Sequence, residues 1–160
     1  MRRNFRLIVL SAACMGLILI PKTGEAVDVT ALVKEITAAN AENGAGPKAA
    51  RAAKKKIVDG GAAVLPDLLL ALENEDSVTV NWVLSAFQDI TRNAIRLGGK
   101  NLPADKITAI SADEKRTPRV RRLAIELLAK AAPRVATERL FAALKETEDQ
   151  AFRAVLLGML

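Results

Sequence analysis

Apolar residues recur along this chain in helical stripes, and one stripe is repeated at a fixed offset. Five apolar residues with the spacing of one helix face reappear 32 residues later with the same spacing. The first set is Val120, Leu123, Ala124, Leu127 and Leu128, and the second is Phe152, Val155, Leu156, Met159 and Leu160. Each set follows a residue that caps helices well, Thr117 or Asp149. A helix stripe that returns at a fixed period predicts an array of stacked units.

The remaining apolar stripes predict further helices of the same kind. Capping residues, prolines and glycines place them at 27–43, 47–59, 62–74, from Asp76, from Pro103, at 117–130, at 135–145 and from Asp149. Residues 96–101, which include Gly98-Gly99, are expected to form a flexible loop. The first helices of successive units start 30, 41 and 32 residues apart, within the range of helical repeats.

The predicted fold class is therefore all-α: an α-α solenoid of antiparallel helix pairs. Residues 27–46 form an N-terminal capping helix, and residues 47–160 form about three units plus a truncated helix. The length of 160 residues suits one domain. The composition agrees, because 51% of residues are hydrophobic and only 3% are aromatic, which favours closely packed helices over a β-sandwich.

The first 26 residues have the three parts of a secretory signal peptide. Arg2, Arg3 and Arg6 precede an apolar run at 7–20, and Gly24-Glu25-Ala26 offers a cleavage site before Val27. An uncleaved anchor is the alternative, but the run is shorter than the ~20 residues that span a bilayer. A lipid anchor on Cys14 is disfavoured because the apolar run continues past it. We expect an exported protein, periplasmic or extracellular, without a stable membrane anchor after cleavage.

Export changes what the charge and the cysteine content imply. Cleavage removes four basic residues and one acidic residue, which leaves 20 basic and 17 acidic residues and a net charge of +3. It also removes the only cysteine, so the mature chain would depend on no disulfide.

Two segments resemble the helices of the HEAT-repeat family, in particular its bacterial HEAT-like variants. Gly61-Ala62-Ala63-Val64-Leu65-Pro66-Asp67-Leu68-Leu69-Leu70-Ala71-Leu72, followed by Glu73-Asn74-Glu75-Asp76, resembles the second helix and the turn between units. Pro118-Arg119-Val120-Arg121-Arg122-Leu123-Ala124 resembles the first helix, and Thr147-Glu148-Asp149-Gln150-Ala151-Phe152-Arg153 repeats that start. The unit at Asp76 departs from the pattern because it has no arginine at the expected position. The resemblance, over 47–160, implies a solenoid whose surfaces bind proteins or other macromolecules.

The densest basic cluster is the candidate binding site. It surrounds the predicted helix start at Thr117, where free N–H groups and the helix dipole attract anions. Its members are Lys115, Arg116, Arg119, Arg121 and Arg122. The functional interpretation is a patch that binds an anion or a partner. The alternative is solvated surface whose charges pair with Asp113, Glu114 and Glu126.

Other charged and aromatic features have simpler explanations. Lys54-Lys55-Lys56 fans around a helix, and Glu73, Glu75 and Asp76 lack the spacing of a calcium loop. Trp82 lies on an apolar stripe, which favours core packing over partner binding. Nucleic-acid binding is not expected, because aromatic residues are few. The absence of histidine removes Ser–His and Cys–His catalysis, so we expect no enzyme and no cofactor or metal.

These observations predict a non-catalytic, exported scaffold that binds a protein partner. Because the final stripe ends on apolar residues, the last unit is expected to be incomplete and the chain to be the N-terminal fragment of a longer protein. One alternative is an accessory repeat region of an enzyme whose catalytic domain lies beyond residue 160. Another is an electrostatic binder of anionic envelope polymers.

Overall fold

The computed structural model describes residues 27–41, 46–73 and 77–160, and this part of the chain is helical without strands. Its elements are α1 (Val29–Ala41), α2 (Gly46–Asp59), η1 (Gly61–Val64, a 3₁₀ helix), α3 (Leu65–Ala71), α4 (Ser77–Arg96), α5 (Ala104–Ala112), α6 (Pro118–Ala131), α7 (Pro133–Glu146) and α8 (Gln150–Leu157). The predicted signal peptide at 1–26 and the predicted cap Asp76 lie outside the described residues. No described helix is long and apolar enough to cross a membrane.

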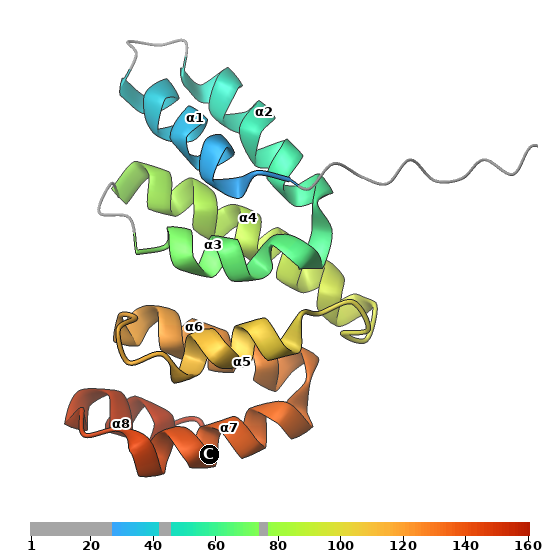
Figure 1. The fold of residues 1–160 in the computed structure, drawn as a ribbon. Helices are drawn as coiled ribbons and strands as arrows, with labels where there is room; N and C mark the ends of the chain where they lie inside the picture. The colour runs from blue at the N-terminus through green and yellow to red at the C-terminus, as the bar shows by residue number, and fades with distance from the viewer. Residues whose placement is uncertain (1–26, 42–45, 74–76) are drawn as a thin grey trace, which may run out of the picture.

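The helices form a stack of pairs, but the segment predicted as a separate cap at 27–46 belongs to a pair, because α1 packs on α2 as α3 packs on α4 and α5 on α6. Figure 1 shows the pairs following one another from α1 and α2 at one end to α7 and α8 at the other. The odd helices contact one another in the order α1, α3, α5, α7, and the even helices contact in the order α2, α4, α6, α8. We call these two sets the odd layer and the even layer. The predicted all-α array of helix pairs is confirmed.

Capping side chains set several helix starts where the sequence predicted them. Asp28 Oδ1 accepts from the Ala31 N–H at 3.0 Å, and Asp149 Oδ1 accepts from the Phe152 N–H at 3.0 Å. Thr117 Oγ1 accepts from the Val120 N–H at 3.4 Å, ahead of Pro118 at the first position of α6. A proline is tolerated there because a first-turn N–H has no partner within the helix. Pro133 likewise begins α7.

The helix predicted at 62–74 is shorter than expected and begins with a 3₁₀ turn. Pro66 has no N–H, so it cannot donate to the carbonyl of Ala62 as an α-helix starting there requires. The chain instead forms η1, and the α-helical bonding of α3 begins at Leu65.

The loop predicted at 96–101 forms a turn that backbone hydrogen bonds close. The N–H of Gly99 bonds to the carbonyl of Ala94 at 2.9 Å, and the N–H of Gly98 bonds to that of Ile95 at 2.9 Å. These two bonds form a Schellman motif, in which a left-handed residue closes the helix. Both glycines have φ of +70°. An added Cβ on Gly99 would lie 2.2 Å from the carbonyl oxygen of Ala131, so this turn packs against the end of α6.

The buried apolar residues form two clusters. The larger cluster runs from α1 to the start of α7, and Trp82 packs against it as predicted. The smaller cluster joins α6, α7 and α8 and consists of Ile125, Leu140, Ala143, Phe152 and Leu156.

Phe141, within the helix predicted at 135–145, has a side chain that is 51% exposed. Leu157 and Leu160 are exposed as well.

Candidate functional site

The five basic residues of the predicted patch do not share one surface. Lys115, Arg119 and Arg122 are exposed, Arg116 is half-buried in the turn before α6, and Arg121 is only 5% exposed. Arg121 and Arg122 are neighbours in sequence, but successive residues on a helix point about 100° apart. The placement of Arg121 in a surface patch is therefore wrong, because that side chain points into the stack. The idea that the exposed members bind an anion stays a prediction.

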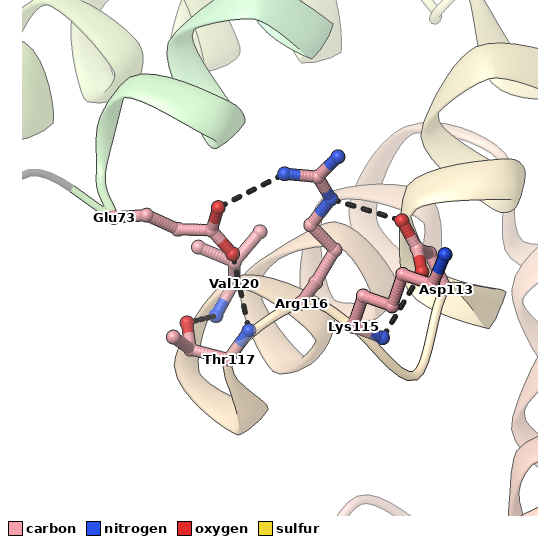
Figure 2. A network of polar contacts seen from close by, with 6 residues as sticks. All are labelled: Glu73, Asp113, Lys115, Arg116, Thr117 and Val120. Carbon is pink, nitrogen blue, oxygen red and sulfur yellow. Dashed lines mark hydrogen bonds and ion pairs between the residues drawn. The ribbon is translucent and has the colours of Figure 1, made fainter.

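Arg116 is held between two carboxylates of the protein itself (Figure 2). Its Nη1 donates to Glu73 Oε2 at 3.0 Å, and its Nε donates to Asp113 Oδ2 at 3.0 Å. The hydrogen bond to Glu73, followed by that to Asp113, raises the pKa of Arg116 above its ordinary value. Glu73 lies just after α3, so this contact ties the end of α3 to the start of α6.

Glu73 also occupies the anion-attracting end of α6. Its Oε1 accepts from the backbone N–H of Thr117 at 3.1 Å, as Figure 2 shows. Thr117 in turn caps the N–H of Val120, and Pro118 has no N–H to offer. A carboxylate at a helix N-terminus is favoured by the helix dipole. The N–H of Thr117, at the helix start where an external anion was expected to bind, is thus already hydrogen-bonded to Glu73. This carboxylate of the protein itself lies 44 residues earlier in the chain.

Asp113 makes the stability of this contact between the end of α3 and the start of α6, which we call the junction, depend on pH. The backbone N–H of Lys115, followed by the side chain of Arg116, lowers the pKa of Asp113 below its ordinary value. A carboxylate whose pKa is lower in the folded than in the unfolded protein stabilises the folded state. The stabilisation is fully present above the pKa of the carboxylate in the unfolded chain, about 3.9. It is lost as the pH falls through the pKa of the carboxylate in the folded protein.

We expect Asp113→Asn to flatten the loss of stability on acidification below about pH 4, because the group that takes up the proton on unfolding is gone. Urea unfolding midpoints measured at several pH values between about 2 and 6 check this. Asp105→Asn on α5 is the control, since Asp105 is an exposed carboxylate away from the junction. Parallel acid limbs for wild type and Asp113→Asn would contradict the assignment.

Three arginines form a buried or half-buried polar seam between the last units. Arg121 Nε donates to the carbonyl of Ser111 at 3.3 Å, and its guanidinium carbon lies 4.3 Å from the ring centroid of Phe152. Arg139 Nε donates to Ser111 Oγ at 3.1 Å, and its Nη1 pairs with Glu146 at 2.8 Å. Arg153 Nη2 donates to the carbonyl of Thr147 at 2.6 Å. The seam links α5, α6, α7 and α8 beside the smaller apolar cluster.

Basic residues elsewhere also act between or along helices, and the fan predicted for Lys54-Lys55-Lys56 is confirmed. Lys54 Nζ reaches across to α4, where it pairs with Asp89 at 2.7 Å and bonds to Ser85 Oγ at 2.8 Å. Lys55 pairs with Asp59 on its own helix. Arg122 pairs with Glu126 on α6, one of the acids that the sequence suggested as its partner.

The two layers differ strongly in charge, which the local clusters did not reveal. The four even helices carry twelve basic and three acidic residues, a net charge of +9. The odd helices, including η1, carry five of each and have no net charge. Nine of the twelve basic residues are exposed, namely Lys48, Arg51, Lys55, Lys56, Arg92, Arg96, Arg119, Arg122 and Lys130. The even layer, rather than one turn, is therefore the candidate binding surface.

The described residues hold no group of three or more histidine, cysteine or acidic side chains placed to bind a metal. Comparisons with known protein families, with curated proteins and with solved structures found no match to this chain.

Proposed function

We propose that this protein is an exported, non-catalytic scaffold of HEAT-like helix pairs that binds an acidic protein partner on its even layer. The observation that carries the proposal is the net charge of +9 on the even helices beside an uncharged odd layer. A surface of one sign attracts partners of the opposite sign and speeds their association. Export is supported by the pattern of residues 1–26.

The apolar character of this layer favours a protein partner. Leu84, Leu123 and Ile95 reach the surface among the basic residues, and a protein segment can cover them. Stacked helices provide an extended platform for such a partner.

The basic layer also supports a second candidate, the binding of anionic envelope polymers. A polymer bound by charge alone is released as salt rises, since the Debye length falls to about 8 Å at 0.15 M. Retention on an anionic matrix that salt leaves unchanged would exclude this candidate.

Site-specific photocrosslinking in the cells that produce the protein tests the proposal. A photoreactive residue at Gln88 samples the even layer, and one at Asp105 samples the odd layer, with both positions exposed. We expect protein adducts from position 88 and not from position 105, on a mature chain that begins at Val27. Adducts from neither position, or equal adducts from both, would refute the proposed binding face.

A further inference from the structure

An apolar groove runs between α4 and α6 on the even layer. It has a volume of about 280 Å³. Its apolar walls are Leu84, Phe87 and Ile95 on α4 and Leu123 and Leu127 on α6. Ile95 is 38% exposed, so part of this wall faces solvent. Covering apolar surface of this kind with another apolar side chain is favourable, because both are removed from water.

A second groove lies between α6 and α8. It has a volume of about 350 Å³ and is lined by Pro118, Arg119, Arg122, Ala151, Phe152 and Val155. The α6 residues that line the two grooves lie within about half of the helix circumference, and the two sets occupy adjoining sectors of it. The two sets are centred about seven residues apart, which is about 10 Å along the helix axis. A single segment crossing α6 can therefore reach both grooves.

The rims of the two grooves carry mostly positive charge. Arg92 and Lys130 border the first groove together with Glu126, and Arg119 and Arg122 border the second. Arg92 is paired with Asp89, and Arg122 is paired with Glu126. Arg119 and Lys130 form no ion pair with any residue that the structure describes. Two cations next to apolar walls are thus available to an incoming carboxylate.

We propose that an acidic amphipathic segment of a partner protein lies across α6, with apolar side chains in both grooves and carboxylates against Arg119 and Lys130. This inference rests on the proposed scaffold function and names its site and the chemistry of its partner. A polyanion without apolar side chains would pair with the basic residues at the rims but would leave the apolar groove walls exposed to water. Four acidic residues of this chain, Glu114, Glu146, Glu148 and Asp149, line a polar hollow together with Arg116 and Arg121. A second copy of the chain therefore complements the grooves less well.

Three synthetic probes separate these possibilities when their affinity for the full chain is measured by fluorescence anisotropy. The first is an 18-residue peptide with leucine and glutamate on opposite helix faces. The second has the same composition in an order that forms no apolar face, and the third is polyglutamate of equal charge. We expect the first to bind roughly tenfold or more tightly than either control, since only it buries leucine side chains in both grooves.

Two variants locate the binding. Ile95→Ser, which changes an exposed wall residue, and Lys130→Glu, which reverses a rim charge, should each weaken binding of the first peptide by roughly fivefold or more. Lys106→Glu on the odd layer is the matched charge control and should leave the affinity unchanged. Circular dichroism melts show whether each variant is folded.

Equal binding of all three probes, no binding of the first, or insensitivity to both even-layer variants would overturn the inference. Light scattering can also show that the chain forms a dimer and that the first peptide dissociates this dimer. That result would overturn the inference in favour of a second copy of the chain as the occupant. These failures differ from failure of the proposed function, because protein adducts at position 88 would still support a scaffold that uses this layer in another way.

Discussion

Replacing Gly99 by alanine is expected to lower the free energy of unfolding by about 2–5 kcal/mol. About 1–2 kcal/mol comes from forcing an alanine into the left-handed region, and about 1–3 kcal/mol from pressing a methyl group into a packed site. The added Cβ would lie 2.2 Å from the carbonyl oxygen of Ala131. Backbone at the end of α6 cannot move aside as a flexible side chain can. Urea unfolding followed by circular dichroism measures the loss.

Gly98→Ala is the matched control, because Gly98 has the same φ of +70° and no atom within 4 Å of an added Cβ. Only the left-handed penalty of about 1–2 kcal/mol applies to it. Equal losses for the two variants would show that the contact with α6 adds nothing. Such a result would mean that residues 96–101 act as the simple loop that the glycines predicted.

Truncating Phe152 to alanine is expected to cost about 3–5 kcal/mol, the range for a buried aromatic side chain. Phe152 is 1% exposed and is the largest member of the smaller apolar cluster. Its ring also covers the guanidinium of Arg121, so truncation removes a cation–π contact from a buried charge. The substitution should speed the hydrogen exchange of the α8 amides more than that of the amides in α2 or α4.

Phe141→Ala removes the same side chain from a position that is 51% exposed. Surface substitutions away from special features change stability by about 0.5 kcal/mol or less. A loss for Phe141→Ala as large as that for Phe152→Ala would mean that α7, and not α8, supplies the core of the last unit.

The apolar stripes predicted the helices well because their spacing and their capping residues are local. They predicted the buried face of α6 less well. Ile125 and Arg121 lie outside the predicted stripe, yet both are buried. The reason is that α6 has neighbours on more than one side, with α8 packed against it as well as α5 and α7. A stripe defines one face, so it misses the residues that face the other neighbours of the helix.

The candidate site could be predicted only in part, because sequence proximity groups charges that the fold separates. Glu73, the partner of Arg116, lies 43 residues away in the chain, and no spacing rule links the two. The charge difference between the layers was, in contrast, accessible from the sequence. Charges summed over alternate helices, instead of over runs of neighbouring residues, would have revealed it.

The unequal charge of the two layers gives the stack an electric dipole perpendicular to its long axis. In the field of a negatively charged body such a molecule turns before it touches, so that the even layer faces the source. Encounter would then begin in a nearly correct orientation, at a rate that depends on ionic strength. The lifetime of the complex would instead depend on how well apolar side chains fill the grooves beside α6. Salt and groove chemistry would therefore control two different rate constants of one interaction.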